Sequence, residues 1–196
     1  MTLFSTLALA MGASWVSGIN LYAGVATLGL LGRYAGLELP GELTVLTDWW
    51  VIGVALGMYV VEFVADKIPY VDSTWDVVHT FIRVPAGAVL AAATFGAFDG
   101  SVQVIAFLLG GGIALSSHGM KTGTRAAINT SPEPVSNITA SVAEDAVAVG
   151  SIGLAAFFPI AIVVLVSLAV LASLFIIPRT LGSFRNFLRR FRSSPD

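Results

Sequence analysis

The residues best suited to chemistry form a polar cluster that follows a long apolar stretch in the second half of the sequence. Lys121 and Arg125 lie four positions apart and would share one face of a helix. Two cations beside hydroxyl groups and a helix N-terminus near Gly119 would suit phosphate, carboxylate or a lipid headgroup. The same cations would also suit an ordinary cytoplasmic loop. The cluster comprises Ser116, Ser117, His118, Lys121, Thr122, Thr124, Arg125, Asn129, Thr130 and Ser131.

Two acidic residues, Glu62 and Glu144, fall within or beside apolar stretches. A charge at the centre of a membrane helix costs about 3 kcal/mol on insertion scales, so such acids are candidates for function. A structural alternative is pairing with Arg83 or Lys121 across a helix bundle. We therefore interpret Glu62 and Glu144 as coupling or structural acids.

Patterns for catalysis and metal binding are weak. The spacing of Asp72, Asp76 and His79 would let an Asp and a His touch a metal, but Asp76 is better explained as a helix N-cap. The sequence contains no Cys and no recognised catalytic motif. We expect no catalytic residues, no metal site and no cofactor.

The elements that must position these side chains are apolar helices. Of the 196 residues, 56% are hydrophobic and 11% are charged, against a usual charged share of about 25%. A membrane helix needs about 20 residues, and every backbone polar group inside the bilayer must be paired. We predict an all-α polytopic membrane bundle with about six passages, at residues 3–31, 49–65, 77–98, 102–117, 140–157 and 160–177.

The two halves of the chain repeat each other in outline. Gly18-Ile19-Asn20 interrupts the first passage, and His118-Gly119-Met120 follows the fourth. Because each half has three passages, the second half would be inverted in the membrane, as in many transporters. We predict two inverted repeats, at about 1–98 and 101–178, each with a glycine-broken segment. The two glycines would equally serve close helix packing.

A basic tail, residues 179–196, follows the predicted membrane domain of residues 1–178. It holds five of the ten basic residues and alternates arginines with apolar side chains at helical spacing, which suits an amphipathic helix on anionic headgroups. Placing these arginines in the cytoplasm puts Lys67, Lys121 and Arg125 on the same side. We expect a multi-pass protein of the cell inner membrane with both termini cytoplasmic, lipids as partners and no nucleic-acid partner.

The order of several motifs resembles that of a known family. The motifs are Gly18-Ile19-Asn20, Leu31-Gly32-Arg33, Glu62, Ile68-Pro69-Tyr70-Val71-Asp72, Gly110-Gly111-Gly112, Lys121-Thr122-Gly123-Thr124-Arg125, Asn129-Thr130-Ser131-Pro132, Asn137 and Glu144. Over roughly residues 12–172 the chain resembles the bacterial integral membrane proteins of domain of unknown function 4126. That family has no established activity, so the resemblance implies a membrane fold and no catalytic residues. The segment after Arg125 departs from the family pattern in having less Thr and Gly.

These observations predict a small membrane transporter or channel for a small anion or anionic headgroup. Its site would lie between the two broken segments. Two alternatives stand beside it. In a non-transporting scaffold or subunit, neutralising Glu62 would change assembly and leave flux alone, whereas a lipid-handling protein would need a lateral opening beside Lys121 and Arg125. The predicted binding residues are Asn20, Tyr22, Ser117, His118, Lys121, Arg125 and Asn129, flanked by Glu62 and Glu144.

A homodimer is a further expectation. Gly87, Ala88 and Ala91-Ala92-Ala93 lie in the third predicted passage, and their small side chains would let two such helices approach closely.

Overall fold

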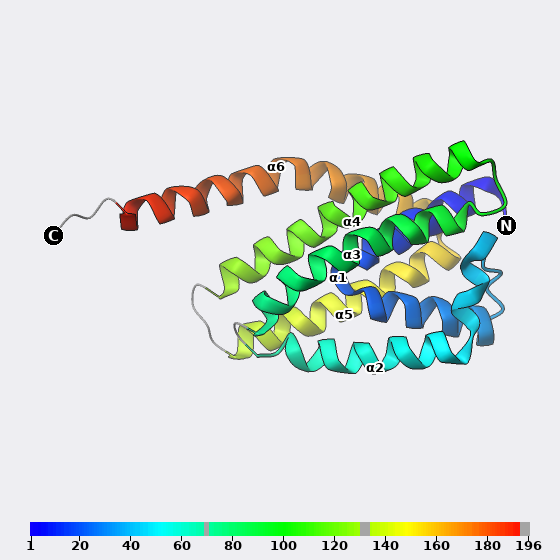
Figure 1. The fold of residues 1–196 in the computed structure, drawn as a ribbon, viewed down its shortest axis with the longest axis horizontal. Helices are drawn as coiled ribbons and strands as arrows, with labels where there is room; N and C mark the ends of the chain where they lie inside the picture. The colour runs from blue at the N-terminus through cyan, green and yellow to red at the C-terminus, as the bar shows by residue number, and fades with distance from the viewer. Residues whose placement is uncertain (69–70, 130–133, 193–196) are drawn as a thin grey trace.

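The computed structural model describes residues 1–68, 71–129 and 134–192, with residues 180–192 described as backbone only. The described chain forms an elongated helical bundle in which α2 to α6 run lengthwise (Figure 1). The helices are α1 (Leu3–Tyr34), the 3-10 helix η1 (Gly41–Thr47), α2 (Trp49–Ala65), α3 (Val71–Thr94), α4 (Gly100–Ile128), α5 (Pro134–Phe157) and α6 (Pro159–Arg192).

The number of membrane-competent helices agrees with the prediction. In the described residues, α1, α3, α4, α5 and α6 are each long and apolar enough to cross a membrane. The pair formed by η1 and α2, bent by 72°, is a sixth candidate. The predicted all-α membrane bundle, with about six candidate passages by length and composition, is therefore confirmed.

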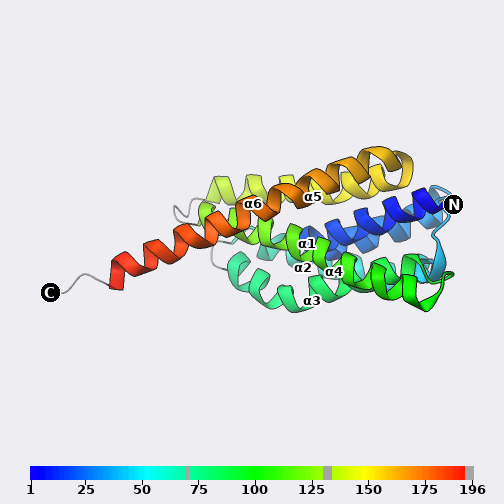
Figure 2. The same cartoon turned by 90° about the horizontal axis from the view of Figure 1, so that it is seen from above.

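The first helix, α1, folds back on itself at Asn20, whose φ of −148° and ψ of 93° are not helical. A Cβ on Gly24 would lie 2.7 Å from Cγ1 of Val16, although eight residues span about 12 Å along a straight helix. The N-terminal amine of Met1 also lies 3.8 Å from the Glu38 carboxylate. α1 is therefore a helical hairpin whose two arms begin and end at the same end of the bundle (Figures 1 and 2). The break predicted at residues 18–20 is confirmed, and we refer to these residues as the hairpin tip.

The two arms of the hairpin supply much of the apolar core. Leu9, Val16 and Leu28 are fully buried among side chains from the surrounding helices. Small residues bring the first arm close to α3, where the hydroxyl of Ser14 donates to the carbonyl of Gly87 at 3.0 Å. This packing of small residues is common between membrane helices. It holds the hairpin inside the bundle and so fixes the position of its tip.

The second predicted break is wrong, because α4 runs unbroken from Gly100 to Ile128. Gly119 serves packing instead: a Cβ there would lie 2.9 Å from Cδ1 of Ile177 on α6. We predicted the passage to end at Ser117, where the sequence turns polar. The helix continues because Lys121 and Arg125 have buried partners on neighbouring helices.

Two other boundaries differ from the prediction. α3 begins at Val71, so Asp76 lies inside the helix and is not its N-cap. α6 continues past Pro178 to Arg192, and it extends beyond the end of the bundle (Figure 1). An internal proline removes only one backbone hydrogen bond of a helix, which the rest of a long apolar helix can tolerate. The side chains of the predicted amphipathic tail lie outside the described residues.

The surface predicted for a homodimer is not available. Gly87, Ala88 and Ala91 are buried within the protomer, where α3 meets α1 and α4. Exposed small residues lie instead on α2, at Gly53 and Gly57, where a Cβ would meet nothing within 4 Å.

Candidate functional site

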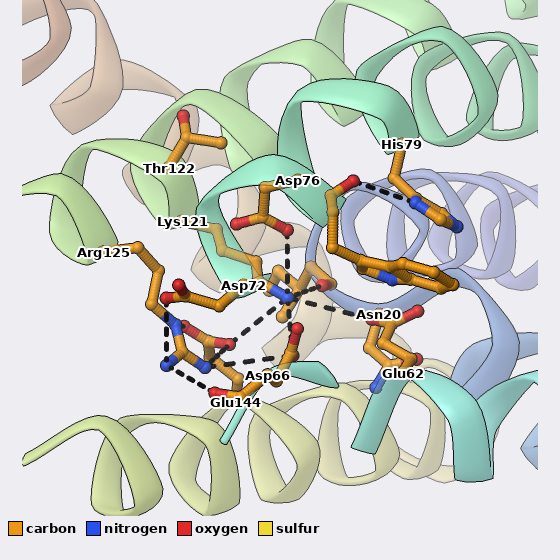
Figure 3. A network of polar contacts seen from close by, with 12 residues as sticks. Asn20, Glu62, Asp66, Asp72, Asp76, His79, Lys121, Thr122, Arg125 and Glu144 are labelled. Atoms are coloured by element: carbon orange, nitrogen blue, oxygen red, sulfur yellow. Dashed lines mark hydrogen bonds and ion pairs between the residues drawn. The ribbon is translucent and has the colours of Figure 1, made fainter. Parts of the chain in front are cut away.

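A buried network of charged side chains lies between the hairpin tip and the end of the bundle where α2 meets α3 (Figure 3). Among the described residues, this charged network contains six carboxylates and three cations, and Asp145 joins it through Asn20. Most of these side chains are almost completely buried, and Glu144 is the most exposed, at 16%. Its members are Glu62, Asp66, Asp72, Asp76, Arg83, Lys121, Arg125, Glu144 and Asp145.

Helical periodicity explains why distant parts of the sequence meet here. On α3 the residues Asp72, Asp76, His79 and Arg83 follow at intervals of four, three and four, and therefore share one face. On α4 the same holds for residues 118, 121, 125 and 129. Both faces point into the bundle, since these side chains are buried or half-buried. The network is thus the polar core of an otherwise apolar bundle.

Arg83 anchors the network beside the hairpin. Its guanidinium is fully buried and lies 2.7 Å from the Glu62 carboxylate and 2.7 Å from the Asp76 carboxylate. Burying charges costs several kcal/mol per ion, and ion pairing offsets this cost only when the geometry is good. The predicted pairing of Glu62 with Arg83 is confirmed, and the energetic cost indicates that the network is not there for stability alone.

Arg125 holds the other side of the network. Its Nε and Nη2 donate to the two oxygens of Glu144 at 3.0 and 2.8 Å. Its Nη1 donates to the backbone carbonyls of Asp66 and Asn137 at 3.2 and 3.1 Å. A planar guanidinium bound at so many points has little freedom to move. Arg125 is therefore a fixed part of the site.

Lys121 lies within a group of four carboxylates (Figure 3). Its Nζ is 3.0 Å from Asp66, 3.4 Å from Glu144, 3.5 Å from Asp76 and 3.8 Å from Glu62. We call these four acids the carboxylate ring. Four carboxylates therefore surround the ammonium group of Lys121, and they share three cations: Lys121, Arg83 and Arg125.

The hairpin tip contributes backbone atoms to the network. The carbonyl of Ile19 accepts a hydrogen bond from Nζ of Lys121 at 3.1 Å, and the carbonyl of Gly18 lies 3.2 Å from Nδ1 of His118. These carbonyls end the first arm of α1, where a helix leaves acceptors unpaired and carries a partial negative charge. The tip therefore adds to the negative potential of the carboxylate ring.

Several carboxylate oxygens accept no hydrogen bond within the described part of the chain. They are Oε2 of Glu62, Oδ1 of Asp66, Oδ2 of Asp76 and Oδ2 of Asp145, all of them buried. A buried acceptor without a partner is costly, and such groups require an explanation. Three of the four belong to the carboxylate ring, so the ring has unused capacity to bind a positively charged or hydrogen-bonding solute.

Asn20 holds the hairpin tip in place. Its Oδ1 accepts from the backbone N–H of Ala23 at 2.9 Å, which caps the second arm, and its Nδ2 donates to Asp145 at 2.9 Å.

We expect Asn20→Ala to lower the thermal midpoint in detergent, because losing a cap costs about 0.5–2 kcal/mol. Asn20→Ser, which can still cap the arm, should recover part of the loss. Equal midpoints for wild type and Asn20→Ala would contradict this role.

At the open end of the network, Lys67 follows α2 and lies outside the membrane-spanning helices. Its Nζ donates to the carbonyl of Phe63 at 2.9 Å and to the hydroxyl of Ser141 at 3.2 Å. Partial burial lowers the pKa of Lys67, whereas the nearby carboxylates of Asp145 and Asp66 act in the opposite direction.

The structure brings most of the predicted site residues together. Asn20, Glu62, His118, Lys121, Arg125 and Glu144 meet around the hairpin tip, and the Asn129 amide donates to the Asp72 carboxylate. Tyr22 lies at the edge, with its hydroxyl 3.3 Å from Nε2 of His79. Ser117 does not join the network, because its hydroxyl donates to Ala114 on its own helix. Their role in binding a solute stays a prediction.

Sequence reasoning missed Asp66, Asp72 and Asp76 as members of the site. We expected Asp76 to cap a helix, but all three acids are at most 2% exposed, and each faces a cation. The regular spacing of charges along α3 was the available signal. In the described residues, no group of three or more His, Cys, Asp or Glu side chains is arranged to hold a metal ion.

Two apolar cavities lie away from the network. One, of about 490 Å³, is lined mainly by α1, α3 and α4, including Leu7, Phe95 and Ala106. The other, of about 350 Å³, lies between α4 and α6 beside Leu115 and Ile177. Neither is lined by Lys121 or Arg125, so neither provides the lateral opening that a lipid-handling protein would need.

The fold and the site define a multi-pass helical membrane protein with a charged core at the tip of a helical hairpin. A family model described as Domain of unknown function (DUF4126) matches residues 7–179, and the chain belongs to this family. The family resemblance of the motifs is thereby confirmed. No curated protein and no solved structure matches the chain.

Proposed function

We propose that this protein is a small membrane transporter whose solute is a small monovalent cation. The observation that carries the proposal is the carboxylate ring beside the broken backbone of the hairpin tip. Transporters commonly coordinate Na⁺ or H⁺ with the carbonyls of unwound segments and the C-terminal ends of half-helices, near the middle of the membrane. The Ile19 carbonyl, at the end of the first arm, provides that kind of ligand beside four acids.

The charge balance of the network favours a cation over the anion expected from the sequence. An anion would need free cations, but Arg83, Lys121 and Arg125 are already paired with carboxylates at 2.7–3.0 Å. Six carboxylates would repel it within the described network. A cation would instead find carboxylate oxygens with no hydrogen-bond partner.

The hairpin itself supports a transport role. Non-helical backbone at membrane depth is tolerated only where protein or a water-filled cavity covers it. Here protein covers the tip, and the covering side chains are charged. Intramembrane charges are costly and mark ion pathways in many membrane proteins. We infer that the bundle is in an occluded state, in which the tip and the charged network together close the pathway. The predicted inverted repeat required three passages in each half. Because α1 returns to its starting end, only α2 and α3 remain as passages of the first half, and this proposal does not include the inversion.

We further propose the inner membrane as the location, with the arginine-rich end of α6 in the cytoplasm. The figures place the N-terminus and the C-terminal end of α6 at opposite ends of the bundle (Figures 1 and 2). The expectation of two cytoplasmic termini assumed that the first helix crosses the membrane, whereas α1 returns to its starting end. With α6 oriented by its arginines, the N-terminus would face the opposite side.

Flux through reconstituted liposomes tests the proposal. We expect the wild-type protein to carry Na⁺, K⁺ or H⁺ along an imposed gradient, followed with ion-sensitive dyes. Glu62→Gln should reduce the flux about tenfold or more, because it removes a charge from the carboxylate ring. Glu38→Gln is the matched control, since Glu38 is exposed at the other end of the bundle.

Two outcomes would count against transport. If wild-type protein carries none of the three cations, the proposal is refuted. If Glu62→Gln alters assembly and leaves flux unchanged, the network has a structural role and the scaffold is the better account.

A further inference from the structure

The surroundings of the Lys121 ammonium are those of a cation site. Its Nζ lies between 3.0 and 3.8 Å from one oxygen of each acid of the carboxylate ring, and it donates to the Ile19 carbonyl at 3.1 Å. Carboxylate and carbonyl oxygens are the ligands that hard metal cations prefer. Among the described residues these acids are not arranged to hold a metal ion while the ammonium group is in place. The same oxygens would have to move closer around a free monovalent cation once the ammonium group leaves.

Lys121 is also the least constrained cation of the network. Arg83 bridges Glu62 and Asp76 at 2.7 Å each, and Arg125 is bound to Glu144 through two nitrogens. The ammonium of Lys121 has two hydrogen-bond acceptors, Asp66 and the Ile19 carbonyl. It stands at the end of a flexible four-carbon stem, whereas a guanidinium is a planar, preorganised group. Of the three cations, Lys121 can leave its place at the lowest cost.

The ring also holds acceptors that Lys121 does not use. Oε2 of Glu62, Oδ1 of Asp66 and Oδ2 of Asp76 are buried and accept no hydrogen bond within the described part of the chain. Each belongs to a carboxylate whose other oxygen is within 4 Å of Nζ. One ammonium group does not satisfy the ring, so a ligand with more coordination positions would bind it more completely.

We propose that Lys121 is a tethered substitute for the transported cation: its ammonium fills the carboxylate ring in the occluded state and is displaced when the solute binds. This inference rests on the proposed transport function and specifies how its site is regulated. An internal cation keeps the ring neutralised while no solute is bound. Without it, Arg83 and Arg125 would be the remaining partners of four carboxylates, and part of the negative charge would be uncompensated. The solute and the ammonium then compete for the same oxygens.

Thermal unfolding of purified protein in detergent tests this competition without requiring transport. NaCl or KCl would be exchanged for choline chloride at constant ionic strength, because choline is too large for the ring. Lys121→Met should become more stable in Na⁺ or K⁺, with a midpoint rise on the order of 5 °C at saturation, whereas wild type should change less. Arg179→Met is the matched control, since Arg179 is exposed and donates to the Phe175 carbonyl.

A second measurement uses the wild-type protein and does not depend on the variant folding. If the cation displaces Lys121, an amine-reactive reagent should modify Lys121 several-fold faster in Na⁺ or K⁺ than in choline, relative to Lys67. Mass spectrometry would give the ratio. Equal labelling ratios in all three salts, or equal midpoint shifts for Lys121→Met and Arg179→Met, would overturn the inference.

These results are separable from the flux experiment. If liposomes with wild-type protein show no cation flux while Lys121→Met is still stabilised by Na⁺ or K⁺, the transport proposal is wrong. The inference that Lys121 substitutes for a bound cation would then still hold. If flux is present and neither lysine measurement depends on the cation, the inference about Lys121 alone is wrong.

Discussion

Arg83→Met should destabilise the protein by about 3–5 kcal/mol, one of the two largest effects we expect. Removing one partner of a buried ion pair leaves the other charge uncompensated, and this is where the cost arises. Here two carboxylates, Glu62 and Asp76, would each lose a contact of 2.7 Å in a fully buried environment. The measurement is reversible unfolding of purified protein in mixed micelles.

Two further variants make the Arg83 experiment specific. The triple variant Arg83→Met with Glu62→Gln and Asp76→Asn removes the stranded charges, so it should recover most of the lost stability. Arg179→Met is the surface control: Arg179 is exposed and donates only to the Phe175 carbonyl, so its effect should stay within about 0.5 kcal/mol. If Arg83→Met and Arg179→Met lower the free energy of unfolding equally, Glu62 and Asp76 do not depend on Arg83 for charge compensation.

Gly18→Ala should destabilise the hairpin tip by about 3 kcal/mol or more. A Cβ at Gly18 would overlap the Ser117 hydroxyl and the Ala114 carbonyl, and it would lie 2.8 Å from the backbone nitrogen of His118. Overpacking usually costs about 1–3 kcal/mol, and here two of the obstructing atoms are backbone atoms of α4, which cannot turn away. The hairpin or α4 would have to move as a whole.

A glycine in open space supplies the control for Gly18. Gly150 lies inside α5, and a Cβ there would meet nothing within 4 Å. Gly150→Ala should therefore be neutral or stabilise by about 0.4–1 kcal/mol, through reduced entropy of the unfolded chain. Thermal midpoints of both variants in the same detergent give the comparison. Similar midpoints for the two would contradict the close approach of the tip to α4.

The position of the break in α1 could be predicted from the sequence, but the direction that the chain takes after the break could not. An apolar stretch of residues 3–31 is too long for a simple passage, and Gly18-Ile19-Asn20 is the obvious place to interrupt it. A kinked helix that crosses the membrane and a hairpin that returns have the same local sequence. Only contacts between residues distant along the chain, such as Asn20 with Asp145 and Met1 with Glu38, separate the two.

The charged network could not be predicted from local sequence, because its members are paired across different helices. Hydropathy ends the fourth passage at Ser117 because it treats Lys121 and Arg125 as side chains that need water. Their partners are carboxylates on other helices, and no local pattern on α4 reveals them. The regular spacing of Asp72, Asp76 and Arg83 on α3 could have indicated a buried polar face. Predicting the third passage to begin at residue 77, with Asp76 as its N-cap, left Asp72 and Asp76 outside the helix and concealed that pattern.

The hairpin in α1 imposes an order on the assembly of the chain. Its tip is made early during synthesis, but its polar partners are His118, Lys121 and Asp145, which lie about a hundred or more residues further along. Lipid offers nothing to pair with the open carbonyls of Gly18 and Ile19. The hairpin can therefore reach its final place only after α4 and α5 have been synthesised. Among the described helices, α1 is synthesised first, yet it is among the last to reach its final position.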